Sequence, residues 1–133
     1  MATVYTIGYG GRKFEDFVHL LKRHGVVVVV DVRRFPKSKY PGFDGKSLQE
    51  ALPKLGIEYL YLGDLLGGFR RGGYQKYMES REYQEGIKRL LEVVEKGGAA
   101  IMCVERSPRA CHRRFITSTL EGLGVKVVHI IKT

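Results

Sequence analysis

The sequence of 133 residues contains no tryptophan and no asparagine, and it contains only three glutamines. Amide side chains are among those that hyperthermophile proteins tend to lack, so this composition favours a thermophilic source. Two cysteines are too few for a disulfide framework, and they favour reduced thiols in a reducing compartment. The apolar runs are far too short to span a membrane, and no signal peptide precedes them. We therefore predict a cytoplasmic protein with no membrane partner.

Charge of one sign is in excess, because 23 basic residues stand against 14 acidic ones and give a net charge of +9. The excess falls into three windows, 33–46, 64–77 and 103–114, whose net charges of +4, +2 and +3 account for all of it. Such windows attract anionic ligands when they are connecting segments. The alternative is that they only keep the protein soluble.

The apolar pattern alternates between strands and helices along the chain. Continuous or β-branched apolar runs predict strands at 3–7, 26–32, 57–62, 99–104 and 125–131. Helical spacing of apolar residues follows most of these strands, and Pro53 should shorten the second helix. The predicted helix caps are Ser47 with Glu50, then Ser80, then Ser107 with Pro108.

This alternation predicts a mostly parallel sheet that is covered by helices on both faces. We expect residues 1–133 to form a single α/β domain with a Rossmann-like three-layer fold. Its five strands are expected in the order 3-2-1-4-5. Ligands of such sheets bind beyond the carboxyl ends of the strands. All three basic windows follow strand ends, so we predict a binding site for an anion or a phosphate there.

The segment 103–114 leaves a strand and opens a helix, whose N-terminus favours anions and lowers the pKa of a nearby thiol. Cys103 is therefore a possible nucleophile, and Glu105 or His112 is a possible general acid or base. Arg109 and Arg113 lie one helical turn apart and can share an anion. The structural alternative is that both cysteines pack as small core residues and that the histidine is a hydrogen-bonded helix residue.

Two known kinds of site fit this segment poorly. Cys103 and Arg109 have the Cys-x5-Arg spacing of cysteine phosphatase loops. The segment lacks glycines for close backbone approach, however, and Glu105 would repel a phosphate. A zinc site built from the two cysteines and His112 lacks the Cys-x2-Cys spacing and a second pair, so no metal site is predicted.

Two further loops carry candidate ligand-binding residues. Asp31 follows the most apolar strand and can ligate a metal, act as a base or pair with Arg33, and the ion pair is the simplest interpretation. Tyr40 and Phe43 then alternate with basic residues, which suits base stacking with phosphate contact, although a packed surface loop would look similar. The glycine-rich and basic segment 67–73 suits a lid or a loop that contacts nucleic acid.

Several short motifs occur together in the chain: Thr6-Ile7-Gly8, Asp31-Val32-Arg33 and Cys103-x-Glu105-x2-Pro108-x2-Cys111-His112-Arg113. They resemble the uncharacterised family called domain of unknown function 488, over nearly the whole chain. The resemblance implies an α/β fold and no established activity. The sequence departs from the family's pattern in the first loop, where Tyr9 replaces a histidine and Gly10-Gly11 replace Ser-Asn.

Two functions are consistent with these residues. The first is an enzyme that acts on a phosphorylated or nucleotide-like substrate, and the second is a non-catalytic nucleic-acid-binding module that uses the basic loops. The expected partner is an anionic small molecule or a nucleic acid, and no cofactor or oligomeric state is predicted. The candidate catalytic residues are Asp31, Cys103, Glu105 and His112. The candidate ligand-binding residues are Gly8, Tyr9, Arg33, Arg34, Tyr40, Arg70, Arg109 and Arg113.

Specific contacts are expected if these residues form one site. Arg33 or Arg113 should lie beside the Glu105 carboxylate, because burying a carboxylate without a partner is costly. His112 is expected to be neutral and to hydrogen-bond that carboxylate or a ligand. Cys111 is expected to have a structural role.

Overall fold

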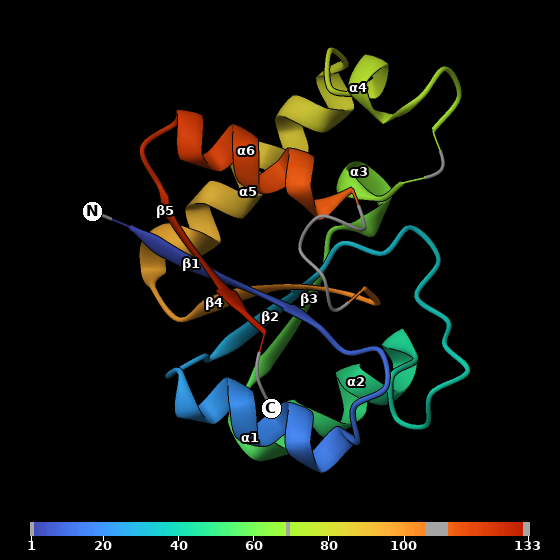
Figure 1. Ribbon diagram of the computed structural model, residues 1–133, viewed down its shortest axis with the longest axis vertical. Helices are drawn as coiled ribbons and strands as arrows, with labels where there is room; N and C mark the ends of the chain where they lie inside the picture. The colour runs from blue at the N-terminus through green and yellow to red at the C-terminus, as the bar shows by residue number, and fades with distance from the viewer. Residues whose placement is uncertain (1, 69, 106–111, 132–133) are drawn as a thin grey trace.

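The computed structural model describes residues 2–68, 70–105 and 112–131. Within these ranges the chain forms one sheet of five parallel strands in the order β3-β2-β4-β1-β5 (Figure 1). The strands are β1 (Thr3–Gly8), β2 (Val28–Asp31), β3 (Glu58–Tyr61), β4 (Ala99–Cys103) and β5 (Lys126–Ile130). All strands run the same way, so the loops that follow β1, β2, β3 and β4 gather at one edge of the sheet.

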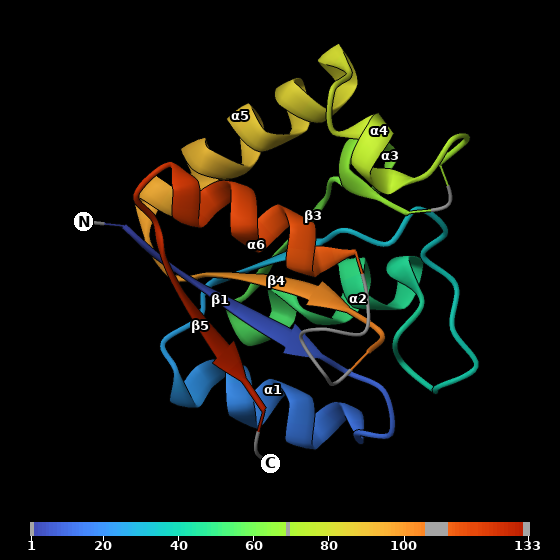
Figure 2. The same cartoon turned by 45° about the horizontal axis from the view of Figure 1, so that its top comes forward.

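Helices cover both faces of the sheet, with α1 and α2 on one side and α5 and α6 on the other (Figures 1 and 2). The predicted Rossmann-like three-layer α/β fold is therefore confirmed. The helices are α1 (Phe14–Arg23), α2 (Gly45–Ala51), α3 (Gly63–Leu66), α4 (Tyr74–Tyr77), α5 (Arg81–Lys96) and α6 (Arg113–Gly122), with a short 3-10 turn η1 (Pro53–Leu55). None of the helices in the described ranges is long and apolar enough to cross a membrane.

The expected strand order 3-2-1-4-5 is wrong, because β4 lies between β2 and β1. Gly8 of β1 pairs with Cys103 of β4, and Asp31 of β2 pairs with Met102 of the same strand. Every residue of β4 is buried, which suits a central strand covered on both faces. Because β1 and β4 are both short and apolar, the local pattern did not decide which of them lies at the centre.

The side chains of the sheet alternate between two apolar clusters. Val28, Val30 and Ile101 face the cluster under α5 and α6, whereas Val29 and Met102 face the cluster over α1 and α2. This alternation is the period of two expected for strands that are buried on both faces.

Helix ends agree with the sequence in two places and differ in a third. The Ser80 side chain accepts the backbone N–H of Tyr83, as predicted for an N-cap, and Pro53 begins a 3-10 turn just after α2 ends. The predicted capping box at Ser47 is wrong, because α2 already begins at Gly45 after Asp44. Ser107 and Pro108 lie outside the described residues.

Candidate ligand-binding site

A cavity of about 430 Å³ lies at the carboxyl edge of the sheet, where the loops after β1, β2 and β4 meet the start of α6. This first cavity is bounded by residues from six separate stretches of the chain. Its lining residues are Tyr9, Arg33, Arg34, Phe35, Lys37, Gly68, Tyr74, Cys103, Val104, Glu105 and His112. The two distant segments that follow β2 and β4 therefore meet at one place, as parallel topology requires.

The end of β2 carries a closed hydrogen-bond network around Asp31, which is 0% exposed. Its carboxylate oxygens accept from the Arg33 guanidinium at 2.9 and 2.7 Å, and also from the Arg33 backbone N–H and the Tyr59 hydroxyl. Nη1 of Arg33 donates to the Tyr9 hydroxyl and to the Phe43 carbonyl. The predicted ion pair is confirmed, and Asp31 does not line the cavity.

Electrostatics hold this network in one protonation state. Burial lowers the pKa of the Arg33 guanidinium, but the hydrogen bonds and the charge of Asp31 outweigh burial, so the pKa lies above its usual value. Burial raises the pKa of the Tyr59 phenol, and the nearby Asp31 carboxylate raises it further. Both groups stay protonated at neutral pH. Because the charges of Asp31 and Arg33 offset each other, the end of β2 adds little net charge to the cavity.

The loop after β1 is packed tightly against β4. Tyr9 is 0% exposed, and its ring stacks on Phe43 with centroids 4.5 Å apart. The Gly10 backbone N–H donates to the Val104 carbonyl at 2.8 Å, and a Cβ on Gly10 would stand only 2.7 Å from that oxygen. The Gly8 carbonyl accepts from the Arg12 guanidinium and does not line the cavity. The glycine that departs from the family's pattern thus allows a close approach of two backbones.

His112 stands at the start of α6 and contributes its ring to the cavity wall. Its Nε2 lies 3.0 Å from the Val32 carbonyl oxygen. A carbonyl only accepts, so Nε2 carries the proton and Nδ1 of the neutral ring has a lone pair. Burial lowers the pKa of His112, and the charges of Arg70 and Arg113 lower it further, whereas the Val32 bond raises it. The ring can therefore accept a proton or a hydrogen bond at Nδ1.

Glu105 lines the cavity with an exposed side chain. Among the described residues no ion pair involves its carboxylate. The expectation that Arg33 or Arg113 lies beside this carboxylate is therefore wrong. Arg113 is 1% exposed and meets Glu105 through the backbone carbonyl at 2.8 Å. The expected bond from His112 to this carboxylate is replaced by the bond to Val32. An exposed carboxylate keeps its water, which removes the desolvation cost that would have required an arginine.

Cys103 lies at the end of β4 and is 2% exposed. Its sulfur is 3.9 Å from the Glu105 carbonyl oxygen. Little of the thiol reaches the cavity, which disfavours direct attack on a ligand.

Of the eight residues predicted to bind a ligand, Tyr9, Arg33 and Arg34 line this cavity, whereas Gly8 and Arg113 do not. The other three are Arg70, Tyr40 and Arg109. The Arg70 guanidinium donates to the Gly67 and Asp64 carbonyls and lies 4.0 Å from the centroid of the Tyr77 ring, so it closes the end of α3 and does not line the cavity. Tyr40 lines an adjacent cavity. Arg109, like Cys111, lies outside the described residues.

Four lining residues, Phe35, Gly68, Tyr74 and Val104, were not singled out from the sequence, although Gly68 lies in the segment 67–73 that was predicted to contact a ligand. Tyr74 donates its hydroxyl to the Leu66 carbonyl, and its ring packs on His112 with centroids 5.2 Å apart. A signal was present, because Tyr74 directly follows the glycine-rich segment that was predicted to contact a ligand. In the described ranges, no three His, Cys, Asp or Glu side chains lie close enough to hold a metal ion.

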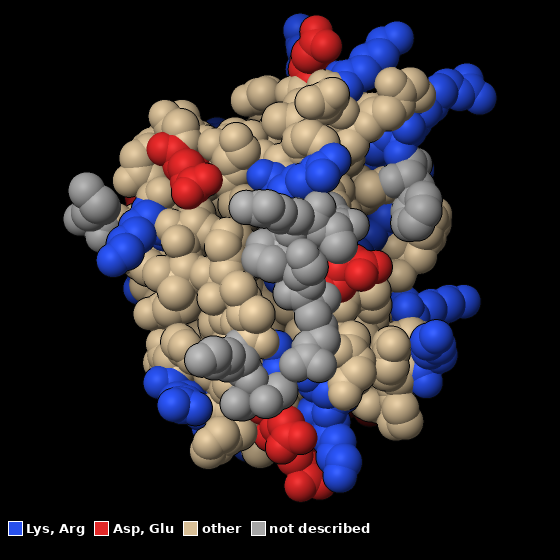
Figure 3. Space-filling view, viewed as in Figure 1, with Lys and Arg blue, Asp and Glu red and all other residues tan. Residues whose placement is uncertain are grey.

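Basic side chains gather on the side of the molecule toward which β1, β2 and β4 point. In Figure 3 several of the visible lysine and arginine side chains project from the right-hand half, where Figure 1 places the loop after β2 and the α3–α4 region. The exposed members from the basic windows in these segments are Lys37, Lys39, Lys46, Arg71 and Lys76. The exposed positive charge is therefore carried mainly by lysines, of which Lys37 and Lys39 lie in the loop after β2, Lys46 on α2 and Lys76 on α4.

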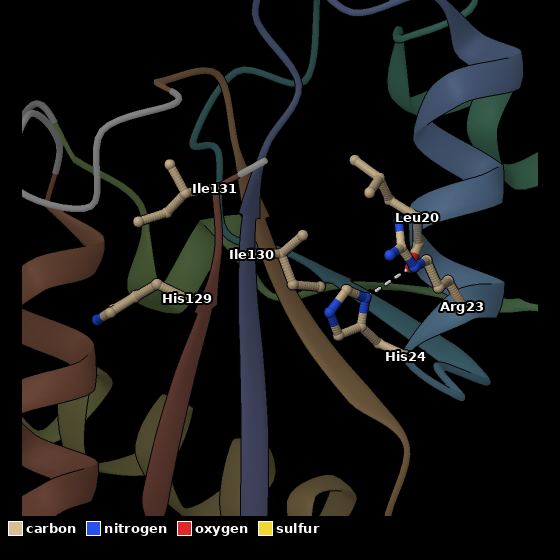
Figure 4. Close-up of a pocket in the computed structure, with 6 residues that line it drawn as sticks. All are labelled: Leu20, Arg23, His24, His129, Ile130 and Ile131. Carbon is tan, nitrogen blue, oxygen red and sulfur yellow. Dashed lines mark hydrogen bonds between the residues drawn. The ribbon is translucent and has the colours of Figure 1, made fainter. Parts of the chain in front are cut away.

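A smaller cavity of about 280 Å³ lies between α1 and the end of β5. In Figure 4 the Ile130 side chain points toward His24, whereas His129 points away across the strand. His24 Nδ1 donates to the Leu20 carbonyl, and His129 Nδ1 is 2.6 Å from the Thr6 hydroxyl. None of the predicted site residues lines this cavity.

The parallel sheet and the helices on its two faces define a Rossmann-like α/β protein. The chain belongs to the family Domain of unknown function DUF488, whose model matches residues 13–73 and 69–120. No curated protein matches the sequence.

Proposed function

We propose that the first cavity binds a phosphorylated small molecule of nucleotide-like chemistry, as an enzyme substrate. The single observation that carries the proposal is that cationic, aromatic and acceptor side chains line one cavity at the carboxyl edge of the sheet. That edge is where parallel α/β proteins bind their ligands.

The cationic part of the cavity consists of Arg34 and Lys37. Arg33 contributes little net charge, because Asp31 holds its guanidinium at 2.7 Å. A phosphate would therefore lie toward Arg34 and Lys37, whose charges favour an anion through charge-assisted hydrogen bonds.

The acceptor part consists of the Glu105 carboxylate and Nδ1 of His112. Both groups accept hydrogen bonds, and a bare phosphate dianion offers them none. A carboxylate near the end of a parallel strand is well suited to the hydroxyl groups of a ribose. A ligand that carries an anion at one end and hydroxyl or amine donors at the other satisfies both parts of the cavity.

The aromatic part consists of Tyr74, which is half-buried beside His112, and Phe35, whose side chain is 63% exposed. The Arg34 guanidinium lies 5.6 Å from the centroid of the Phe35 ring, and aromatic side chains at the rim of a cavity can stack on any nucleobase. This property favours a nucleotide over a sugar phosphate.

His112 and Glu105 are the groups best placed to move a proton on such a ligand. His112 is held in one tautomer by Val32 and kept neutral by burial, as a general base at neutral pH requires. Asp31 and Cys103 act as positioning residues, because the first is fully hydrogen-bonded and the second is almost fully buried.

The alternative of a non-catalytic nucleic-acid module has weaker support. This module would use a basic set in the two loops that consists of Arg33, Arg34, Lys37, Lys39, Arg70 and Arg71. Arg33 is neutralised by Asp31, and Arg70 is bound to backbone carbonyls, so two of its members are already engaged. This leaves a smaller cationic surface than the sequence indicated.

Calorimetric titration with AMP, GMP, CMP and UMP tests the proposal, with adenosine and inorganic phosphate as fragments at equal ionic strength. At least one nucleotide should bind more tightly than either fragment. Lys37→Met should weaken nucleotide binding about tenfold, as expected for loss of a charged hydrogen bond, and leave adenosine binding nearly unchanged. Lys88→Met, the same change at an exposed position of α5, is the control. Phosphate binding as tight as nucleotide binding, or no binding of any of these compounds, would contradict the proposal.

A further inference from the structure

The first cavity does not end at Glu105. A second cavity of about 570 Å³ adjoins it and has four lining residues in common with it, Tyr9, Lys37, Val104 and Glu105. The second cavity is completed by Gly10, Ser38, Lys39 and Tyr40. The two cavities are therefore compartments of one groove that runs from His112 to the loop 37–40.

The wall of the second compartment is held in place by bonds within the protein. The Ser38 backbone N–H donates to the Asp44 carboxylate at 2.6 Å, and the Tyr40 N–H donates to the Ser38 hydroxyl. At the end of the loop, Arg33 donates to the Phe43 carbonyl at 2.7 Å. The compartment is thus formed before any ligand arrives, which lowers the ordering cost of binding.

The opposite wall of the second compartment contains Gly10, which has no side chain to fill the cavity. A Cβ at this position would lie 2.7 Å from the Val104 carbonyl oxygen, so no side chain can project there without a shift of the backbone. The side chains that remain in the compartment are those of the loop 37–40 and the shared wall.

The chemistry of the second compartment repeats that of the first. The Tyr40 ring stands edge-on to Tyr9 with centroids 6.0 Å apart, and the Lys39 ammonium lies 5.5 Å from the Tyr40 ring centroid. The side chains of Lys37 and Lys39 are exposed. An aromatic ring beside lysines is the arrangement that binds one base and one phosphate of a single strand.

We propose that the groove binds the end of a single-stranded nucleic acid, with its terminal nucleotide in the first compartment and the adjoining nucleotide in the second. The proposal rests on the proposed function and specifies its ligand. The linking phosphate lies between Lys37, in the shared wall, and Lys39, and the second base packs on Tyr40. Glu105, also in the shared wall, accepts a hydroxyl of the intervening sugar.

The test compares UMP with the 5′-phosphorylated dinucleotide pUpU by calorimetric titration. We expect pUpU to bind about tenfold more tightly, because one more base stacks and one more phosphate is neutralised. The slope of log affinity against log salt should be steeper for pUpU by about one unit. Lys39→Met should reduce the affinity ratio to about threefold or less and lower the pUpU slope by about one unit. Lys88→Met should change neither value.

The outcomes separate the two proposals. Equal affinity for UMP and pUpU would overturn the second compartment and leave the proposed function standing. No binding of pUpU would overturn the second compartment, and no binding of any of the four nucleotides would overturn both proposals. An equal loss in Lys39→Met and Lys88→Met would assign the effect to overall charge and would overturn the second compartment. A Tyr40→Leu variant that keeps the full pUpU advantage would overturn the stacking of the second base.

Discussion

The ends of β2 and β4 lie side by side at the same edge of the sheet, yet their polar residues are used in opposite ways. At the end of β2 both carboxylate oxygens of Asp31 are hydrogen-bonded by the protein, and the side chain is fully buried. Beyond β4 the Glu105 carboxylate is exposed, and no described residue forms an ion pair with it. Burial and saturation mark a residue that positions others, whereas exposure at a cavity marks one that can meet a ligand.

The largest effect on stability should follow from breaking the hydrogen-bond network around Asp31 at the end of β2. Asp31→Asn removes the negative charge and leaves the buried Arg33 guanidinium without its counter-ion. We expect the free energy of unfolding to fall by about 3–5 kcal/mol, as for other buried pairs that lose one partner. Urea unfolding followed by circular dichroism measures this loss. A change below about 1 kcal/mol would mean that the network contributes little to stability.

A glycine beside the same network should give the next largest effect. A Cβ at Gly63, the first residue of α3, would lie 1.8 Å from the Arg33 carbonyl oxygen. Gly63→Ala should therefore destabilise the protein by about 1–3 kcal/mol, because the backbone must shift. Gly122→Ala at the end of α6 is the matched control, since its Cβ meets nothing within 4 Å. The control should be neutral or stabilising by up to about 1 kcal/mol. Equal melting behaviour of the two variants would contradict the close approach.

The pH dependence of stability should show whether His112, in the wall of the first cavity, is held neutral. Burial lowers the pKa of His112 below its ordinary value of 6.5. The unfolded chain then binds more protons than the folded protein between the folded-state pKa and 6.5. Stability is therefore full above 6.5 and falls as the pH drops through that range, with a slope of up to about 1.4 kcal/mol per pH unit.

Unfolding measured from pH 5 to 8 tests this sign. His112→Gln should flatten the dependence below 6.5, because it removes the group whose protonation opposes folding. Burial also lowers the pKa of His129, so His129→Gln should flatten the curve independently, and the two changes should add. A His112→Gln profile identical to that of the parent protein would show that His112 is not held neutral.

The smallest effect on stability is expected at the exposed carboxylate. Glu105→Gln keeps the shape of the side chain and breaks no ion pair among the described residues, so the free energy of unfolding should change by less than about 0.5 kcal/mol. Nucleotide binding should weaken in the same variant, because the amide is a poorer acceptor for a hydroxyl. A large loss of stability would show that Glu105, like Asp31, supports the fold through contacts of its carboxylate.

The sequence predicted the layered architecture of the sheet better than the order of its strands. The five strands, the two covered faces and the pairing of Asp31 with Arg33 follow from local patterns and from adjacency in the chain. The position of β4 between β2 and β1 depends on long-range packing, which the apolar pattern of either strand does not encode. Parallel topology was enough to place two distant segments at one edge of the sheet, but the order of the strands within the sheet could not be predicted.

The site was predictable at the level of segments and less so at the level of side chains. Residue type alone suggested a ligand role for Arg70, but its guanidinium meets the carbonyl groups at the end of α3. Glu105 was expected to need an arginine because its exposure was unknown. Tyr74 became a lining residue only through the turn that brings α4 over His112. Each difference arises from where a side chain points, which spacing does not determine.

The hydrogen bond from Arg33 to the Phe43 carbonyl has a consequence for how this protein can diversify. It ties the far end of the loop to the sheet through a residue that is itself fixed by Asp31. The exposed side chains between those two points, including Lys37 and Lys39, can be replaced one at a time while the loop keeps its course. The residues that hold the loop are therefore not the residues that the proposed groove would present to a ligand, so substitutions that change ligand preference need not destabilise the fold.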